Sequence, residues 1–242
     1  MSQIKEHYDN HLASFYSWML GDFNLRVQEQ EDFFKKNSIV PKDNKVALDL
    51  GAGNGIQSVA LARLGFDVKA IDFSGQLLDE LKSNSAGLSI QTIAGDFTDI
   101  EILSRFSPSL VTCMGDTITH IGSVDSLTKL IDHVYDISEK DALFVVSYRD
   151  LSRELEDTQR FIPVKADDKR ILTCFLEYFA GYVRVTDLLY EKEADKWIQK
   201  VSSYQKLRLS LDTVRNLFMK NNYSLIDMEM IRGMNYLIFQ KR

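Results

Sequence analysis

The sequence predicts an α/β protein built on a doubly wound, mostly parallel β-sheet. Between residues 45 and 148, short apolar strand patterns alternate with amphipathic helical patterns, which demands parallel strands joined by right-handed crossovers. The first strand ends in a glycine-rich turn, Gly51–Gly55, where the backbone can pass close to a ligand. Two strand patterns around Arg232-Gly233 predict a C-terminal antiparallel hairpin. Together these observations indicate a Rossmann-like sheet.

The elements follow one another with clear start and stop signals. Residues 8–36 repeat apolar side chains with helical period, and Lys35-Lys36-Asn37 closes that segment as a helix C-terminus. A turn at 41–44 precedes the alternating region. The strand patterns there cover 45–50, 67–71, 88–94, 109–114 and 141–148, and the helical patterns cover 55–64, 75–84, 97–106 and 123–138.

The pattern changes after Arg149. Residues 151–169 are charged and aperiodic, which predicts a loop or short helix covering the site. Three alternating stretches then predict an antiparallel meander, and a helix precedes the final hairpin. These segments are 171–179, 182–192 and 197–209 for the meander, 211–220 for the helix, and 223–230 and 235–241 for the hairpin.

We interpret the chain as a single domain, 1–242, in four parts. An N-terminal helical cover (1–40) precedes a ligand-binding core (41–150), and a β-meander insertion (151–210) precedes the last helix and hairpin (211–242).

Composition limits the function classes. The 242 residues are 45% hydrophobic and carry a net charge of −6 with no Lys/Arg run, which argues against a nucleic-acid partner. No window is long and apolar enough for a membrane span or signal peptide, and the two cysteines, Cys113 and Cys174, lack zinc or disulfide spacing. His7 and His11 have helical spacing but no further ligands, so we expect solvent-facing histidines and no metal. A cytoplasmic location is the expectation.

The glycine turn favours a nucleoside ligand other than a dinucleotide. A dinucleotide fingerprint needs a third glycine where Ile56 stands, and no phosphate-binding G-x-x-x-x-G-K-[ST] sequence is present. Asp72, at the end of the second strand, is placed to accept hydrogen bonds from ribose hydroxyls, although it could instead cap the next helix in competition with Ser74. Asp96 and Phe97, after the third strand, suit an adenine amino group and ring, with a helix cap as the alternative.

The ends of the fourth and fifth strands supply candidate acceptor-side groups. Asp116 follows the fourth strand and is placed to hold an acceptor or to take its proton. His120 lies in a turn, where a structural histidine is more common than a catalytic one. Arg149 suits a carboxylate partner through its planar fork, with a surface ion pair to Asp150 or Glu154 as the rival interpretation.

The spacing D-x-G-x-G-x-G at Asp49–Gly55 resembles motif I of the class I S-adenosylmethionine-dependent methyltransferases. Further segments are similar to the glycine N-methyltransferase group. They are Tyr16–Arg26, Cys113-Met-Gly-Asp116, Ser147–Asp150 and Lys206–Ser210.

The resemblance implies S-adenosylmethionine as cofactor and S-adenosylhomocysteine as product. It implies cofactor contacts from the cover, where an aromatic and an arginine match, and from the strand ends. The implied cofactor-binding residues are Tyr16, Arg26, Gly51, Ala52, Gly53, Asp72, Phe73, Leu77, Asp96, Phe97 and Met114. It also places Arg149 against an acceptor carboxylate and His120 at the family's histidine.

One departure concerns the acceptor. Asp116 replaces the asparagine of that family, which favours a cationic or more basic acceptor, or a role as base. We expect methyl transfer to a small metabolite, an amine or amino-acid-like molecule, by a monomer or homodimer. O- or S-methylation and a non-catalytic nucleoside-binding regulator are the alternatives. Tyr8, Tyr16 and Trp18 are expected to close over the cofactor, and Tyr178 and Tyr190 to line the acceptor site.

Overall fold

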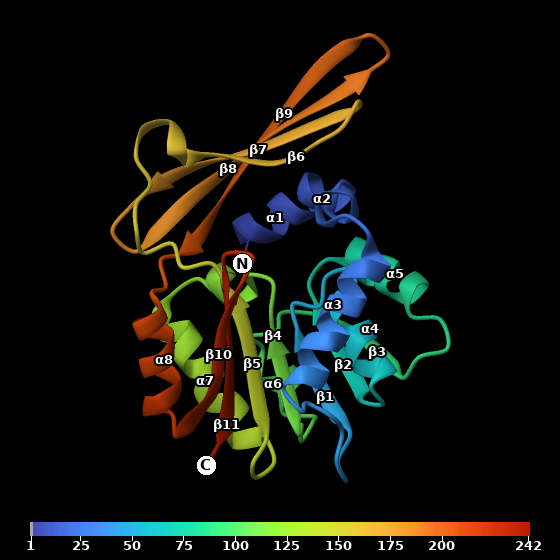
Figure 1. Cartoon of the computed structure of the whole chain (residues 1–242), viewed down its shortest axis with the longest axis vertical. Helices are drawn as coiled ribbons and strands as arrows, with labels where there is room; N and C mark the ends of the chain where they lie inside the picture. Colours follow the sequence, from blue (N-terminus) through green and yellow to red (C-terminus); the bar gives the residue numbers. More distant parts are fainter. Residues whose placement is uncertain (1) are drawn as a thin grey trace.

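The computed structural model describes residues 2–242, and the side chains from Ile4 onward. A seven-stranded sheet with helices on both faces forms the lower part of Figure 1, and a four-stranded sheet lies above its carboxyl-end edge. The N-terminal helices lie between the two sheets. The predicted fold class is therefore confirmed, including the N-terminal cover and the separate antiparallel sheet.

The seven-stranded sheet has the order β10-β11-β5-β4-β1-β2-β3. Neighbouring pairs from β3 to β5 are parallel, whereas β11 runs antiparallel to both β5 and β10. The chain starts in the middle of the sheet with β1 and continues outward through β2 to β3. It then crosses to β4 on the other side of β1, so the strand order reverses between β1 and β4. The strands are β1 (Val46–Leu50), β2 (Asp67–Asp72), β3 (Ile90–Ala94), β4 (Leu110–Cys113), β5 (Leu143–Tyr148), β10 (Tyr223–Ile231) and β11 (Met234–Lys241).

Two apolar clusters hold helices against the two faces of this sheet. One contains buried side chains of α3, α4 and α5, and the other contains those of α6, α7 and α8. Within residues 2–242, none of the helices has the length and apolar character required to cross a bilayer. The helices are α1 (Ser2–Asn10), α2 (Tyr16–Leu20), α3 (Phe23–Lys36), α4 (Ile56–Arg63), α5 (Gly75–Asn84), α6 (Ile100–Leu103), α7 (Val124–Ile137) and α8 (Leu211–Lys220), with 3₁₀ turns at Leu12–Ser14, Thr117–His120 and Asp157–Arg160.

The helix expected over 97–106 is much shorter than predicted. The Asp96 carboxylate accepts from the Thr98 backbone N–H at 2.8 Å, which keeps residues 96–98 in a turn. Asp99 then acts as the N-cap of α6 by accepting from the Glu101 N–H. Side-chain competition for backbone donors therefore delays the start of this helix.

The four-stranded antiparallel sheet has the order β6-β7-β8-β9. Its first strand was not predicted, because residues 151–169 were expected to be a loop or short helix. Pro163 is tolerated there because β6 is an edge strand, where one backbone donor is not needed, and the pairing shifts between Pro163 and Lys165. The strands are β6 (Phe161–Ala166), β7 (Arg170–Tyr178), β8 (Tyr182–Glu193) and β9 (Lys196–Leu207).

One face of this sheet packs on α1. Val183, Val185 and Leu189 of β8 are at most 4% exposed and alternate with half-buried residues, as a one-sided strand requires. His7 of α1 and His11, directly after α1, are buried on the side of the helix that faces this sheet, at 3% and 8% exposure. The expectation of solvent-facing histidines was therefore wrong, because the meander covers the helix face that the sequence alone leaves open.

The packing of α8 gives a stability prediction. Phe218 is fully buried, stacks on Phe239 with ring centroids 4.0 Å apart, and meets Phe144 edge-on at 5.0 Å. We expect Phe218→Ala to lower the free energy of unfolding by about 3–5 kcal/mol, since it leaves a cavity in the core. The neighbouring Met219→Ala, at a residue 49% exposed, is the control and should change it little. The measurement is urea unfolding. Equal losses of unfolding free energy in Phe218→Ala and Met219→Ala would contradict this packing.

Candidate active site

The candidate site lies at the carboxyl ends of β1, β2, β4 and β5. Parallel strands bring these ends to one edge, and the reversal between β1 and β4 separates the connecting loops there. That edge faces α1, α2 and the four-stranded sheet in Figure 1. The residues predicted from the strand ends therefore do meet in one region of the molecule.

The glycine loop is held by backbone contacts to β2. The N–H groups of Gly51 and Ala52 donate to the Ile71 carbonyl at 2.9 and 3.0 Å, and that of Gly53 donates to Asp72 Oδ2 at 2.8 Å. Gly51 has φ +73°, and a Cβ there would lie 2.4 Å from Thr117 Cγ2. This position therefore requires glycine for both its backbone conformation and its close approach to the loop after β4.

Asp72 joins the glycine loop to α5. The residue is 6% exposed, and its Oδ1 accepts from the Ser74 N–H at 2.8 Å while Oδ2 holds Gly53. Burial raises the pKa of this carboxyl. Ser74, and not Asp72, is the N-cap of α5, since its side chain accepts from Leu77 N–H. Each Asp72 oxygen uses one acceptor position within the protein and retains a second.

Asp49 is a site residue that the strand-end reasoning did not select. It is 1% exposed, directly below the glycine loop, and accepts hydrogen bonds from Ser58 Oγ at 2.5 Å and Thr112 Oγ1 at 2.9 Å. Burial raises the pKa of Asp49 to about 6. Its place as the first residue of the D-x-G-x-G-x-G spacing was the available signal.

Aromatic side chains of α1 and α2 cover the loop. A Cβ on Gly53 would lie 3.3 Å from the Tyr16 hydroxyl, so this phenol sits directly over the loop. Tyr8 meets Phe73 edge-on at 5.3 Å and lies 6.3 Å from the Tyr16 ring. Ser17 connects α2 to the glycine loop and to α5. Its hydroxyl donates to Glu80 at 2.5 Å and accepts from Asn54 at 2.9 Å. Tyr8 and Tyr16 therefore lie beside the strand ends, and their closure over a cofactor stays a prediction.

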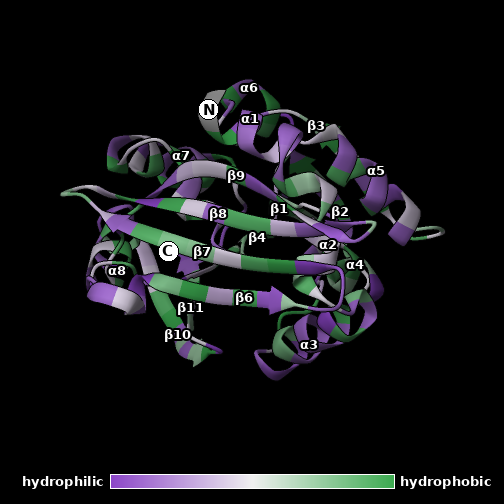
Figure 2. Ribbon diagram, turned by 90° about the horizontal axis from the view of Figure 1, so that it is seen from above, coloured by the Kyte–Doolittle hydropathy of each residue, from purple (hydrophilic) through white to green (hydrophobic). Residues whose placement is uncertain are grey.

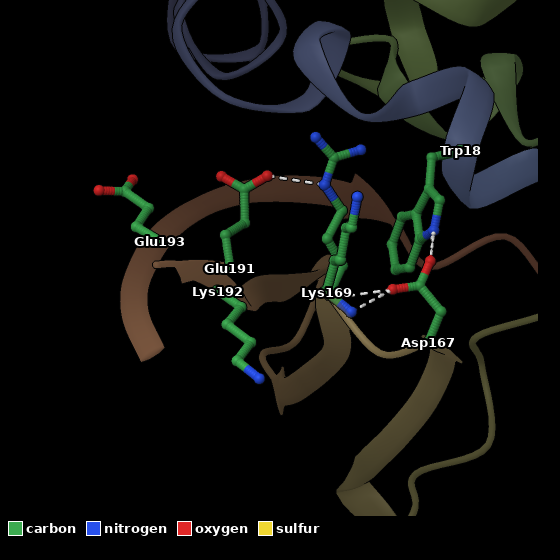
Figure 3. A pocket seen from close by; sticks show the side chains of 7 residues that line it. Trp18, Asp167, Lys169, Glu191, Lys192 and Glu193 are labelled. Atoms are coloured by element: carbon green, nitrogen blue, oxygen red, sulfur yellow. Dashed lines mark hydrogen bonds and ion pairs between the residues drawn. The ribbon is translucent and has the colours of Figure 1, made fainter. Parts of the chain in front are cut away.

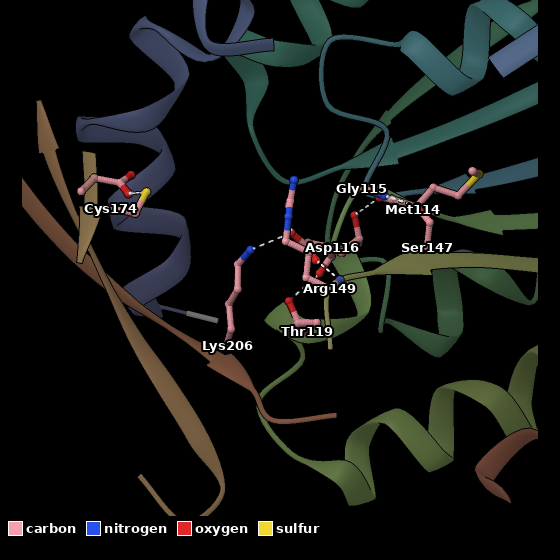
Figure 4. A network of polar contacts seen from close by, with 10 residues as sticks. Met114, Gly115, Asp116, Thr119, Ser147, Arg149, Cys174 and Lys206 are labelled. Carbon is pink, nitrogen blue, oxygen red and sulfur yellow. Dashed lines mark hydrogen bonds and ion pairs between the residues drawn. The ribbon is translucent and has the colours of Figure 1, made fainter. Parts of the chain in front are cut away.

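Asp116 is the centre of a network that joins β4, β5 and β9 (Figure 4). Its Oδ1 accepts from the Arg149 backbone N–H at 2.6 Å, and its Oδ2 accepts from Arg149 Nη1 at 2.5 Å and Lys206 Nζ at 3.0 Å. The residue is 3% exposed, yet the two neighbouring cations hold the pKa of its carboxyl well below the usual range against the effect of burial. Asp116 also has φ +76°, a conformation that side chains rarely adopt.

This network changes the interpretation of Asp116. A carboxylate with so low a pKa is a poor proton acceptor, and its charge is already paired with two cations. The expectations of a base, or of a partner for a cationic acceptor, therefore lose their support. Lys206 was not predicted as a site residue, because it comes from the meander and no strand-end rule points to it.

His120 lies against the same network and is neutral. Burial is the main cause that lowers its pKa to about 3, and the charge of Lys206 adds to the effect. Its ring stacks on Tyr204 at 5.5 Å and meets Tyr8 edge-on at 6.1 Å. The Nδ1 atom is buried without a hydrogen-bond partner among the described residues, which is unusual for a histidine with only a structural role.

Several predicted residues have other surroundings. Arg26 donates to the Leu20 carbonyl and to Glu29, and the structure gives it no polar contact with the glycine loop. Tyr190 was expected to line the acceptor site, but it neighbours the inward-facing Leu189 and therefore points to the opposite face of the sheet. Leu77, Phe97 and Met114 are at most 5% exposed, Asp96 is half-buried, and Tyr178 packs with the inner cluster of the meander.

Trp18 binds the meander rather than covering the glycine loop. Its Nε1 donates to Asp167 at 2.5 Å, and it lines a surface groove of about 390 Å³ (Figure 3). The other lining residues carry balancing charges and come from β7, β8 and the turns beside them. They are Asp167, Lys169, Arg170, Glu191, Lys192 and Glu193. This groove lies away from the strand-end residues, and the expectation for Trp18 was wrong.

Comparison with known proteins shows what this architecture is similar to. Residues 47–141 match the family described as a methyltransferase domain. The fold is similar to an S-adenosylmethionine-dependent methyltransferase from Clostridium acetobutylicum, with a TM-score of 0.73 at 15% identity over 99% of this chain and 98% of the other. The predicted resemblance to class I methyltransferases is therefore confirmed.

Two further similarities concern particular proteins. A glycine/sarcosine N-methyltransferase from Aphanothece halophytica is 25% identical over 159 residues, covering 63% of this chain and 59% of the relative's length. An amino pentose methyltransferase from Micromonospora echinaspora, solved with S-adenosylmethionine bound, has a TM-score of 0.74 at 13% identity, covering 90% of this chain and 92% of the other. The likeness to glycine N-methyltransferases predicted from the sequence agrees with the first.

Asp49 gives a pH-dependence prediction. Because its pKa rises from 3.8 to about 6 on folding, the folded state holds this proton more tightly than the unfolded one. The associated stability is present below pH ~4 and is lost as the pH rises through about 6, which amounts to about 3 kcal/mol at pH 7. We expect Asp49→Asn to gain stability relative to the wild type between pH 4 and 7.

The measurement is urea unfolding of both proteins across that pH range. The exposed Asp168→Asn serves as the control and should follow the wild type throughout. A constant difference between Asp49→Asn and the wild type at every pH would show that Asp49 does not titrate in this range.

Proposed function

We propose that this protein is an S-adenosylmethionine-dependent methyltransferase that methylates a nitrogen of a small acceptor. The observation that carries the proposal is the glycine loop tied to Asp72 beneath Tyr16, at the point where the strand order reverses. The methyltransferase-domain match over residues 47–141 supports the class, and the solved relative with bound S-adenosylmethionine supports the cofactor.

The charges around the loop suit this cofactor better than a phosphate. Asp49 and Asp72 are buried beside the loop, and Gly51–Gly55 contains no lysine or arginine. Carboxylates at this position disfavour a pyrophosphate and favour a positively charged sulfonium. Asp72, with a free acceptor position on each oxygen, would hold the ribose hydroxyls, and the glycine backbone would lie along the methionyl part.

The bound cofactor would supply an electrophilic methyl group. The protein would orient the acceptor and exclude water from the site. Methyl transfer of this kind needs an acceptor lone pair held in line, so orientation is the main catalytic contribution. Tyr8 and Tyr16 exclude water, which would otherwise compete as a nucleophile. His120 Nδ1, neutral and without a partner, would accept a hydrogen bond from the acceptor nitrogen and fix its direction.

The acceptor would carry an anionic group as well as the nitrogen. Arg149 and Lys206 bring two positive charges to the single negative charge of Asp116, so the cluster keeps a net charge of +1. Arg149 is 54% exposed in its side chain and retains donors that Asp116 does not use. Asp116 would then position both cations, and the glycine/sarcosine N-methyltransferase relative supports an amino-acid-like acceptor.

Cofactor binding tests the first part of the proposal. We expect isothermal titration to detect S-adenosylmethionine and not NAD, and Asp72→Asn to weaken binding about 10- to 100-fold, because two ribose hydrogen bonds lose a charged acceptor. Asp79→Asn, on the exposed surface of α5 with 74% of its side chain accessible, is the matched control and should bind normally. Tight binding of NAD would sink the proposal.

Acceptor kinetics test the second part. Release of S-adenosylhomocysteine is measured with small amines that carry a carboxylate and with their neutral amides. We expect Arg149→Met and Lys206→Met to lower kcat/KM about 10- to 100-fold more for the carboxylates than for the amides, since only the carboxylates lose a charge-assisted contact with the acceptor. Lys200→Met, on the same strand but 47% exposed in its side chain, is the control. Equal losses of kcat/KM on the carboxylates and on the amides would contradict the proposal that the acceptor carries an anionic group.

A further inference from the structure

The side of β9 that faces α1 carries a stack of three aromatic rings. β9 is the edge strand nearest α1 in Figure 2. The rings belong to His7 of α1, Tyr204 of β9 and His120 of the 3₁₀ turn after β4. The ring centroids of His7 and Tyr204 lie 4.2 Å apart at an interplanar angle of 29°, and those of Tyr204 and His120 lie 5.5 Å apart at 28°. We call these three rings the ring stack. It connects the N-terminal cover to the candidate active site.

The His7 end of the ring stack is fixed by polar contacts. Its Nδ1 lies 2.7 Å from the Ser202 hydroxyl, and its Nε2 lies 3.4 Å from Asp187 Oδ2. His7 and Asp187 are 3% and 2% exposed, so water does not compete for these contacts. Ser202 and Tyr204 lie two positions apart on β9 and share its inward face. His7 is therefore held against the strand that carries Tyr204.

The His120 end has no polar anchor. A histidine that acts through one ring nitrogen is usually oriented by a hydrogen bond to the other. Within residues 4–242, neither ring nitrogen of His120 makes a hydrogen bond, and Nδ1 is buried. The ring is in contact instead with Tyr204, which stacks on it, and with Tyr8, which meets it edge-on at 6.1 Å. Aromatic packing therefore decides the direction of Nδ1.

Tyr204 is better placed than Tyr8 to fix this direction. A stacked neighbour limits how far the plane of the His120 ring can tilt, whereas an edge-on neighbour touches only one side of it. Tyr204 is 7% exposed and lies on a strand, paired with Val185 of β8, and His7 stacks on its ring. Side chains supported in this way on a strand hold a site more precisely than those on mobile segments.

We propose that Tyr204 is a positioning residue for methyl transfer, whose ring fixes the orientation of His120 and so aims Nδ1 at the acceptor nitrogen. The inference rests on the proposed function, in which His120 Nδ1 accepts a hydrogen bond from that nitrogen. Tyr204 acts through His120 and needs no contact with the acceptor or the cofactor. Only the ring of Tyr204 is required, because the hydroxyl takes no part in the stack.

Nuclear magnetic resonance tests the ring stack without methyl transfer. The chain has four histidines, so the labelled ring of His120 is assigned by its loss in His120→Gln. We expect the order parameter of the His120 ring C–H to be about 0.85 in the wild type and in Tyr204→Phe, and below about 0.6 in Tyr204→Leu, which lacks the ring. Tyr204→Met, another side chain without a ring, replaces Tyr204→Leu if that variant does not fold.

The matched control is Tyr182→Leu. Tyr182 stacks on Phe179 with centroids 4.6 Å apart, but it alternates with the inward-facing Val183 and so lies on the opposite face of the same sheet. We expect the His120 ring to stay rigid in this variant and kcat to be unchanged.

A double-mutant cycle tests the effect on the reaction. We expect Tyr204→Leu to lower kcat about 10-fold, Tyr204→Phe to retain it, and the dissociation constant of S-adenosylmethionine to be unchanged in both. In a His120→Ala background, Tyr204→Leu should cause no further loss, because residues that act through one another are not additive.

Two results would overturn the role of Tyr204 alone. One is a folded Tyr204→Leu whose His120 ring stays as rigid as in the wild type. The other is an equal loss of kcat from Tyr204→Leu with and without His120, since Tyr204 would then act independently of it. A wild type that releases no S-adenosylhomocysteine with any small amine would instead contradict the proposed function, and with it the role of Tyr204. The first two results leave methyl transfer intact and are therefore distinguishable from the third.

Discussion

The contact of Asp116 with Arg149 and Lys206 connects the parts of this structure that matter for its site. Asp116 follows β4, Arg149 follows β5, and Lys206 comes from β9 of the other sheet. A buried carboxylate is costly unless it is paired, and breaking such a pair leaves a charge without compensation. Arg149 pairs with Asp116 within the seven-stranded sheet, and Lys206 extends this contact to the meander.

Three buried carboxylates lie near the strand ends, and each has different hydrogen-bond or charge partners. Asp49 accepts from the hydroxyls of Ser58 and Thr112, and burial raises the pKa of its carboxyl. Asp72 has backbone N–H partners and also a raised pKa. Asp116 has two cations, and its pKa falls. Environment, and not residue type, therefore decides in which direction the pKa of each carboxyl shifts.

The sequence predicts the seven-stranded sheet well because its signals are local. Each strand is an apolar run, most helix starts have a serine or aspartate cap, and Gly51 marks the close approach after β1. Positions at strand ends follow from the sheet alone, so Asp72, Asp116 and Arg149 were found together.

What the sequence missed depends on contacts between distant segments. Lys206 enters the site only because β9 folds back over β4, and His7 is buried only because β9 covers α1. The strand at Phe161–Ala166 contains a proline, and only its place at the sheet edge makes that acceptable. Tyr190 was predicted on the wrong face of the sheet. The alternation along a strand shows which residues share a face, but the sequence alone does not show which face is turned towards the site.

That alternation also decides which residues of β9 reach the site. On β9, Lys206 and Tyr204 point towards Asp116 and His120, whereas Val201 points away from them. Since successive side chains lie on opposite faces, Val201 makes no direct contact with the site. The 3.0 Å contact of Lys206 with Asp116 therefore depends on the register of β9 against β8, since a slip of one residue would turn Lys206 to the other face of the sheet.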